Sequence, residues 1–253
     1  MSEVKFDFHN KNYIVVGASS GMGRQIACEL AESGAHVLAI ARNEIRLNEL
    51  KSAFSELIST YKGDVRTITN DELSTALDGF VGKHGKINGM VYTAGITAGT
   101  PLRFYDESLA REVMDISFWG AMKFVQVTSK KRYAKRSSSY VLFSSTAGHI
   151  GEKGISVYSA AKAAIRVAIR SIAYDLAKEE HRINTISPGF VRTNMAEKSI
   201  DEIGNPVDAI NRHLLGIGET NDVSGMVLFL LSNRAKWITG EDFIVDGGYM
   251  ARI

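Results

Sequence analysis

Residues 13–24 decide the fold, and they read Tyr13-Ile-Val-Val-Gly17-Ala-Ser-Ser-Gly21-Met-Gly23-Arg24. The apolar run 13–16 is typical of a buried strand, and the glycines after it allow a tight turn into a helix. Glycines at these positions let the backbone approach a ligand closely, and the N-terminus of a helix attracts phosphate. We therefore expect a strand–turn–helix unit that binds a pyrophosphate; the alternative is a purely structural turn.

The same rhythm continues along the chain, where short apolar runs alternate with longer helical patterns. Expected strands are 13–17, 35–41, 87–93, 139–144, 182–187 and 243–246, with a weaker one before Asp64; expected helices are 23–33, 43–57, 69–83, 107–132, 158–179 and 221–231. Such alternation is typical of a parallel sheet covered by helices on both faces. No linker, repeat or low-complexity segment is visible, so we predict one α/β domain over residues 1–253 with a doubly wound parallel sheet.

One stretch, residues 190–217, interrupts this rhythm. It is long, mixed in polarity, and contains Gly204, Pro206 and Gly216. Loops of this length in a compact domain are usually functional or disordered. Because it follows a strand end, where ligands collect in open α/β sheets, we expect a substrate lid.

The bulk composition excludes several classes of protein. Of the 253 residues, 45% are hydrophobic, and the net charge of +2 gives no reason to expect nucleic acid or an anionic membrane as a partner. The single cysteine, Cys28, rules out an intrachain disulfide. No apolar stretch reaches the roughly 18 residues of a membrane span, and the charged start shows no secretory signal. We expect a soluble cytoplasmic protein.

The chemistry is indicated by Tyr158, with Lys162 four residues later and Ser145 thirteen residues earlier. Residues i and i+4 share one face of a helix, so the ammonium can lie beside the phenol. A nearby cation favours the phenolate and lowers a pKa that is otherwise about 10. Ser145 can hold a substrate oxygen in line with the phenol. Without a cofactor site elsewhere, this spacing is more often a packed surface pair.

Taken together, the motifs resemble those of the short-chain dehydrogenase/reductase family in its compact, single-domain Rossmann form. The resemblance covers nearly the whole chain, and its Ala94-Gly95-Ile96-Thr97 run and C-terminal third are most similar to the 3-oxoacyl-carrier-protein reductase branch. It rests on the glycine motif, Ser145, Tyr158 and Lys162, together with Asp64-Val65, Ala94-Gly95, Ser187-Pro188-Gly189 with Thr193, and Ile238-Thr-Gly-Glu followed by Val245-Asp-Gly-Gly248.

The resemblance implies roles for individual residues in an oxidoreductase that moves hydride between a nicotinamide and a carbonyl or secondary alcohol. Tyr158 donates the proton, Ser145 orients the substrate oxygen, and Lys162 assists Tyr158 and bridges the nicotinamide ribose. Implied cofactor-binding residues are Gly17, Ser19, Ser20, Gly21, Met22, Gly23, Arg42, Asn43, Asp64, Val65, Ala94, Gly95, Tyr158, Lys162, Pro188, Gly189, Val191 and Thr193. No metal is expected. A 3-oxoacyl thioester is one candidate substrate, and a carrier protein a candidate partner.

The choice of cofactor depends on the end of the second strand. An NAD-preferring dinucleotide fold places a carboxylate there. This chain instead reads Ala41-Arg42-Asn43. A guanidinium can pair bidentately with a 2′-phosphate, and Ser19 and Asn43 can add donors. We therefore expect NADP(H) in preference to NAD(H); Arg42 as a solvated loop cation is the alternative, and Arg24 is the weaker candidate.

Two segments depart from the family pattern. Ser117 replaces an Asn that helps to order a water behind the active-site lysine, and Tyr92-Thr93 replaces Asn-Asn before Ala94. Ser117 has a shorter reach than Asn, so the proton relay is the part of the site where the chain differs from the family. A catalytically weak cofactor-binding sensor or scaffold is therefore the alternative function. An extended epimerase needs a second domain, for which the chain has no room.

Surface features complete the expectations. The run Lys130-Lys-Arg132-Tyr-Ala-Lys135-Arg136 is interpreted as a solvated helix end, with a docking patch for an acidic carrier protein as the alternative. His149, Phe190, Met195 and Ile150 are either walls of the substrate cleft or packed residues. The helix from Tyr158 is apolar nearly all round, which predicts a subunit interface in a dimer or tetramer.

Overall fold

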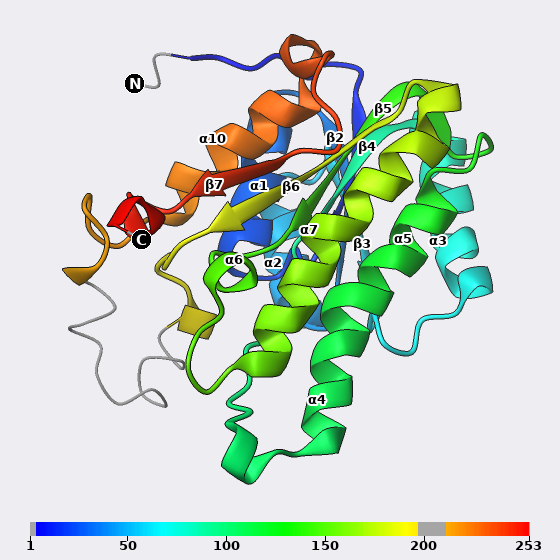
Figure 1. Cartoon of the computed structure of the whole chain (residues 1–253). Helices are drawn as coiled ribbons and strands as arrows, with labels where there is room; N and C mark the ends of the chain where they lie inside the picture. Colours follow the sequence, from blue (N-terminus) through cyan, green and yellow to red (C-terminus); the bar gives the residue numbers. More distant parts are fainter. Residues whose placement is uncertain (1–3, 197–210, 253) are drawn as a thin grey trace.

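The computed structural model describes residues 4–196 and 211–252 (Figure 1). Its centre is a seven-stranded sheet, and every paired strand runs parallel to its neighbour in the order β3-β2-β1-β4-β5-β6-β7. The strands are β1 (Asn12–Val16), β2 (His36–Ala41), β3 (Ile58–Lys62), β4 (Ile87–Tyr92), β5 (Ala134–Phe143), β6 (Arg182–Pro188) and β7 (Asp242–Val245). The predicted parallel sheet is confirmed.

Helices cover both faces of this sheet. They are α1 (Gly21–Glu32), α2 (Glu44–Ala53), α3 (Asn70–His84), α4 (Glu107–Met114), a π turn (Asp115–Trp119), α5 (Gly120–Thr128), α6 (Ala147–Ile150), α7 (Ser156–Leu176) and α10 (Thr220–Leu231). Short 3₁₀ turns lie at Leu102–Phe104, Ala177–Glu179, Asn233–Ala235 and Tyr249–Arg252.

Alternate residues of the central strands pack into two hydrophobic cores, one on each face of the sheet. Tyr13 and Val15 of β1 pack with α1, α2 and α10 on one face. Ile14 and Val16 pack with α3, α5 and α7 on the other. This period of two is what the pleat of a strand dictates, and it explains why the central strands read as continuous apolar runs.

The chain order reverses between β1 and β4, which lie side by side at the middle of the sheet. In open α/β sheets ligands bind outside the carboxyl ends of the strands at such a point. The loops after β1, β4, β5 and β6 all end there, and they carry Gly17, Gly95, Ser145 and Gly189. The topology therefore gathers the predicted site residues at one edge.

Several predicted boundaries are wrong. The helix expected over 43–57 ends at Ala53, and a full strand, β3, follows it. The helix expected over 107–132 is interrupted by the π turn and ends at Thr128, while β5 begins at Ala134 rather than Ser139. The expected helix 158–179 begins at Ser156 and is α-helical only to Leu176. The end of α2 is a local turn, in which Leu57 N and Ile58 N donate to Phe54 O. The start of β5 depends instead on the sheet, because Ile87 N donates to Tyr133 O.

The expected lid is described only at its two ends. A parallel bridge joins Val191 to Gly218, and Gly218 N donates to Phe190 O at 3.0 Å. Residues 197–210 of the expected lid lie outside the described residues.

Candidate active site

The glycine turn after β1 forms an open cradle at the N-terminus of α1. Gly17 and Gly21 have φ of +87° and +53°, a region that glycine enters without penalty. A Cβ on Gly23 would collide with the Gly17 carbonyl oxygen. The N-cap residue Ser20 makes no side-chain capping bond, so its hydroxyl does not cover the first N–H groups of the helix. Uncovered N–H groups at a helix N-terminus fit the pyrophosphate of a dinucleotide.

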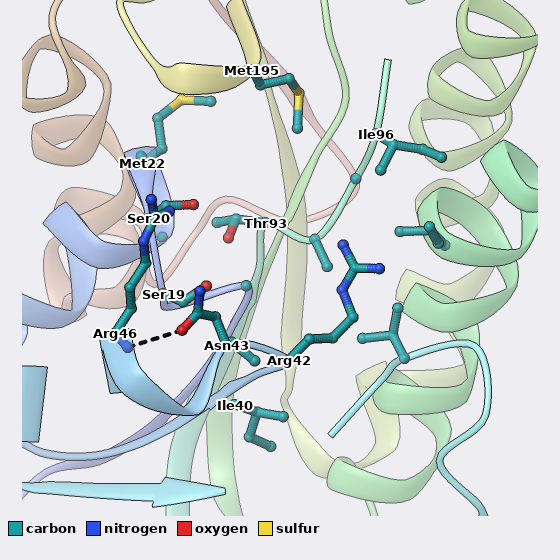
Figure 2. A pocket seen from close by; sticks show the side chains of 18 of the residues that line it. Ser19, Ser20, Met22, Ile40, Arg42, Asn43, Arg46, Thr93, Ile96 and Met195 are labelled. Carbon is teal, nitrogen blue, oxygen red and sulfur yellow. Dashed lines mark hydrogen bonds between the residues drawn. The ribbon is translucent and has the colours of Figure 1, made fainter. Parts of the chain in front are cut away.

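A cavity of about 340 Å³ extends from this cradle towards the ends of β2 and β3. Of the predicted cofactor residues it is lined by Gly17, Ser19, Ser20, Gly21, Met22, Gly23, Arg42, Asn43, Asp64, Val65, Ala94, Gly95 and Thr193. Figure 2 shows the side chains of Arg42 and Arg46 rising on opposite sides of Asn43. Asn43 caps α2 by accepting from Arg46 N at 3.0 Å. The cap fixes the turn that carries both arginines.

Asp64 lies at the far wall of this cavity, where its carboxylate already has partners. Arg66 donates to it from Nε at 3.0 Å and from Nη2 at 2.5 Å, and Arg42 Nη1 lies 3.9 Å away. The hydrogen bond from Arg66 holds the Asp64 pKa below its usual range. An adenine ring can therefore use only the acceptor capacity that Arg66 leaves.

A second cavity, of about 180 Å³, lies over the ends of β5 and β6. Ser145, Tyr158, Lys162, Pro188, Gly189, Val191 and Thr193 are among the residues that line it. The two cavities share Met22, Thr93, Gly95, Thr193 and Met195, so they adjoin. A ligand in the first can therefore present one end to the groups in the second.

Ser145, Tyr158 and Lys162 meet inside this second cavity. Ser145 is hydrogen-bonded to the Tyr158 side chain. The Lys162 Nζ lies 5.6 Å from the Tyr158 ring centroid and donates to Phe143 O at 2.8 Å. Ser144 Oγ donates to Lys162 O at 2.8 Å and fastens α7 to the end of β5. The three groups are thus held by strand and helix backbone rather than by loops alone.

Burial shifts the pKa values of Tyr158 and Lys162 in opposite directions. It raises the pKa of the Tyr158 phenol to about 12, although the hydrogen bond with Ser145 acts to lower it. It lowers the pKa of the Lys162 ammonium to about 8. Both shifts follow from the cost of a charge in an apolar setting. The lowered Tyr158 pKa expected from sequence is therefore wrong for the cofactor-free chain.

Ser117 lines neither cavity. Its hydroxyl is fully buried in the π turn and has no hydrogen-bond partner among the described residues. A Cβ built on Gly95 would lie 3.8 Å from Ser117 Oγ and 3.5 Å from Lys162 Nζ, so both atoms flank the same glycine. The unpaired Ser117 hydroxyl and the nearby Lys162 ammonium are two polar partners that a bridging water can bind.

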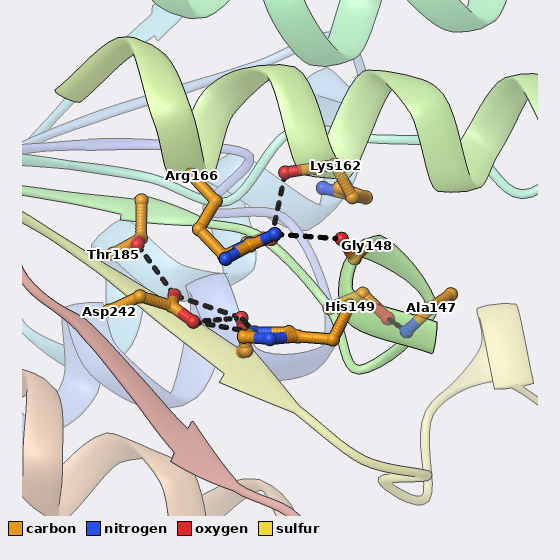
Figure 3. A network of polar contacts seen from close by, with 10 residues as sticks. Ala147, Gly148, His149, Lys162, Arg166, Thr185 and Asp242 are labelled. Atoms are coloured by element: carbon orange, nitrogen blue, oxygen red, sulfur yellow. Dashed lines mark hydrogen bonds and ion pairs between the residues drawn. The ribbon is translucent and has the colours of Figure 1, made fainter. Parts of the chain in front are cut away.

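His149 does not line the substrate cavity. Its Nε2 lies 2.7 Å from Asp242 Oδ2, and Thr185 Oγ1 donates to Asp242 Oδ1 at 2.6 Å (Figure 3). Ser187 Oγ also donates to both carboxylate oxygens. This network ties α6, and so the turn after Ser145, to β6 and β7. Phe190 and Met195 do line the cavity, whereas Ile150 does not.

Sequence reasoning missed several polar residues that line the two cavities, among them Arg46, Glu152, His213 and Tyr249. Arg46 could have been found, because it stands four residues after Arg42 and just after a helix cap. Glu152, His213 and Tyr249 could not, because the contact between Glu152 and Tyr249 spans 97 positions. His213 Nε2 accepts from Phe190 N at 2.9 Å, and its ring stacks on Tyr249 at 4.7 Å.

Comparison with known proteins agrees with this geometry. Residues 17–250 match the family model described as enoyl-(acyl carrier protein) reductase. The chain is 29% identical over 243 residues to the 3-oxoacyl-(acyl-carrier-protein) reductase FabG of Staphylococcus aureus, covering 94% of this chain and 97% of that protein. It is 30% identical over 249 residues to the L-xylulose reductase of Caenorhabditis elegans, covering 96% and 97%.

Solved structures give the same answer. A short-chain dehydrogenase/reductase from Brucella melitensis, described as a glucose/ribitol dehydrogenase, superposes with a TM-score of 0.90 at 25% identity and covers 97% of this chain and 99% of its own. One from Mycobacterium marinum superposes with a TM-score of 0.88 at 27% identity, covering 96% and 97%.

The fold and the site define a nicotinamide-dependent oxidoreductase that acts on CH–OH and C=O groups. The chain belongs to the short-chain dehydrogenase/reductase family.

Proposed function

We propose that the protein is an NADP(H)-dependent carbonyl reductase that transfers hydride between the nicotinamide and a ketone or secondary alcohol. The observation that carries this proposal is the meeting of Ser145, Tyr158 and Lys162 in a cavity that adjoins the glycine cradle. The cradle supplies a place for the pyrophosphate, and the adjoining cavity supplies a proton donor within reach of a substrate oxygen.

The cofactor, when bound, supplies or accepts the hydride. The chain's own residues place the substrate and move the proton. Ser145 hydrogen-bonds the substrate oxygen and aligns it with the Tyr158 phenol, which donates its proton as the carbonyl is reduced. Lys162, held on Phe143 O, lies over the Tyr158 ring and stabilises negative charge that develops on the phenol.

The preference for NADP(H) rests on the two arginines that flank Asn43. No carboxylate ends β2 to accept from a ribose hydroxyl, and Arg42 and Arg46 supply two guanidinium groups to the same cavity. A 2′-phosphate between them gains charge-assisted hydrogen bonds that a 2′-hydroxyl cannot make.

For the substrate, two classes follow from the names of the relatives: a 3-oxoacyl thioester on a carrier protein, and a smaller ketone. The basic run 130–136 does not favour the first. It lies at the amino end of β5, opposite the site, and Lys131, Arg132 and Arg136 are paired with Glu179, Asp78 and Glu180. A carrier protein would need another surface, nearer the cavity.

We also propose a homo-oligomer, dimer or tetramer, through α7. This helix exposes 57% of Val167 and 86% of Tyr174, and Trp119 of the neighbouring π turn is 58% exposed. Light scattering of the purified protein tests this. Among the described residues no helix is long and apolar enough to cross a membrane; a cytoplasmic location and a lid over residues 190–217 remain parts of the proposal.

The test of function is an NADPH-oxidation screen over 3-oxoacyl thioesters, cyclic ketones, quinones and keto-sugars, with the Tyr158→Phe variant as control. We expect turnover of at least one class by the native chain, its loss in the variant, and unchanged NADPH binding by fluorescence. NADPH binding without turnover of any carbonyl would favour the sensor or scaffold instead.

A further inference from the structure

The substrate cavity is mostly apolar, and it contains one acidic side chain among the described residues that line it. Met22, Phe143, Ile155, Phe190 and Met195 form much of the wall. Glu152 lies among them, in the turn between α6 and α7. Glu152 is half-buried, and a carboxylate beside apolar walls gains from a hydrogen-bond donor that reaches it.

The hydrogen bonds of Glu152 leave most of its acceptor capacity unused. Its Oε1 lies 3.2 Å from the Tyr249 hydroxyl, which in turn lies 3.4 Å from Arg212 Nη1. Within the described part of the chain, no cation lies within 4 Å of the Glu152 carboxylate. A carboxylate has about four acceptor positions, and the one neutral hydroxyl leaves the others to the cavity.

Glu152 also acts on the reacting group. Burial is the main cause of the raised pKa of Tyr158, and the negative charge of Glu152 raises it further. Both side chains line the same cavity of about 180 Å³. A substrate that reaches Tyr158 with its carbonyl therefore meets Glu152 with a group farther along the molecule.

We infer that Glu152 is a specificity-determining residue, which selects carbonyl substrates bearing a hydrogen-bond donor, a protonated amine or a hydroxyl, beyond the reacting carbon. This inference rests on the proposed function and narrows it. A donor at that place satisfies the carboxylate, whereas an alkyl tail leaves it unsatisfied and an anionic tail is repelled.

The test uses four ring ketones that differ only at the carbon opposite the carbonyl. They are 4-(dimethylamino)cyclohexanone, which is cationic, its neutral isostere 4-isopropylcyclohexanone, 4-hydroxy-4-methylcyclohexanone, whose tertiary alcohol the oxidised cofactor cannot oxidise, and the anionic 4-oxocyclohexanecarboxylate. Dissociation constants are measured by calorimetry on the protein saturated with oxidised cofactor, which cannot reduce them. Turnover with NADPH is measured separately, so a chain that binds selectively without reducing any ketone contradicts the proposed function and not this inference.

We expect the native protein to bind the cationic ketone at least about 10-fold more tightly than its isostere and to bind the anionic ketone most weakly, as a charged hydrogen bond implies. In the Glu152→Gln variant the preference for the cation should disappear. The hydroxyl compound should change by less than about threefold, because the glutamine oxygen still accepts. Exposed Glu49→Gln is the control for net charge and should leave all four values unchanged.

Two results would overturn the inference. One is a native protein that binds the isostere as tightly as the cationic and hydroxyl ketones. The other is a Glu152→Gln variant in which all four constants shift by the same factor, since that pattern indicates a general effect on the cavity and not recognition of a donor. The first measurement needs no variant, so misfolding of the mutant cannot hide the answer.

Discussion

The hydroxyl of Tyr92 donates a hydrogen bond to the carbonyl of Ile116 at 2.6 Å. With that carbonyl occupied, the Gly120 N–H bonds to Asp115 O, one residue farther back than an α-helix requires. The resulting π turn holds Ser117 beside Lys162. Tyr92 and Ser117, one residue from each segment that departs from the family pattern, are therefore parts of one local structure. Such π turns often occur at functional sites.

Replacing Tyr92 by Phe should release Ile116 O and let the helix return towards α geometry. We expect the free energy of unfolding to fall by about 1 kcal/mol, the typical value of one lost hydrogen bond, and kcat to fall with Ser117 displaced. Urea denaturation and steady-state kinetics measure both. Tyr140→Phe, which removes another buried hydroxyl from a backbone carbonyl, is the matched control and should lower stability alone.

Ser117 should matter to the proton relay and not to cofactor binding. Removing its hydroxyl in Ser117→Ala leaves a bridging water with one partner fewer, so we expect kcat to fall about 3- to 10-fold with the NADPH dissociation constant unchanged. The control is Ser52→Ala on the exposed face of α2. An unchanged kcat in Ser117→Ala would show that the relay, if present, does not pass this residue.

The pKa of Tyr158, raised to about 12 by burial, gives the two reaction directions different pH dependences. Reduction needs the protonated phenol, which predominates throughout the neutral range. Oxidation needs the phenolate, whose fraction grows with pH up to the pKa. We expect ketone reduction to be nearly flat from pH 6 to 8 and alcohol oxidation to keep rising above pH 8, measured in both directions with one substrate pair. An oxidation optimum at neutral pH would contradict this assignment.

The buried ammonium of Lys162 should lower the free energy of unfolding of the cofactor-free protein. Its pKa is about 8 when folded and 10.5 when free, so between these values the unfolded chain binds more protons and stability rises with pH. At neutral pH the buried ammonium costs roughly 3 kcal/mol, which a Lys162→Met variant avoids. We expect the variant to be inactive. Urea titration should show that the free energy of unfolding rises less between pH 7 and 10 in the variant than in the native protein.

These residues separate the features that could be predicted from the sequence from those that could not. The glycine turn and the Tyr158 set are local patterns, because backbone spacing alone brings i and i+4 together, and the sheet follows from alternating runs. The π turn was not predictable, since it depends on Tyr92 meeting Ile116 across 24 residues. The raised pKa of Tyr158 was missed for a related reason: spacing shows the nearby cation but not the burial that outweighs it. The proposed role of Glu152 in substrate recognition could not be predicted either, because it depends on the cavity that distant parts of the chain form around it.

The preference for NADP(H) gives the last prediction, because Arg42 and Arg46 can be removed singly. Each guanidinium adds charge-assisted bonds to a 2′-phosphate, so we expect Arg42→Ala or Arg46→Ala to weaken NADPH binding by about 10- to 100-fold and to leave NADH binding nearly unchanged. Arg42 also lies 3.9 Å from Asp64, so its loss should disturb the adenine end slightly more than loss of Arg46.

Arg24, exposed and outside the cavity lining, is the matched control, and Arg24→Ala should alter neither constant. Tryptophan-fluorescence titration with both cofactors measures this. Comparable NADH and NADPH affinity in the native protein would remove the basis for the preference, because two arginines that meet no phosphate are only solvated cations near the start of α2.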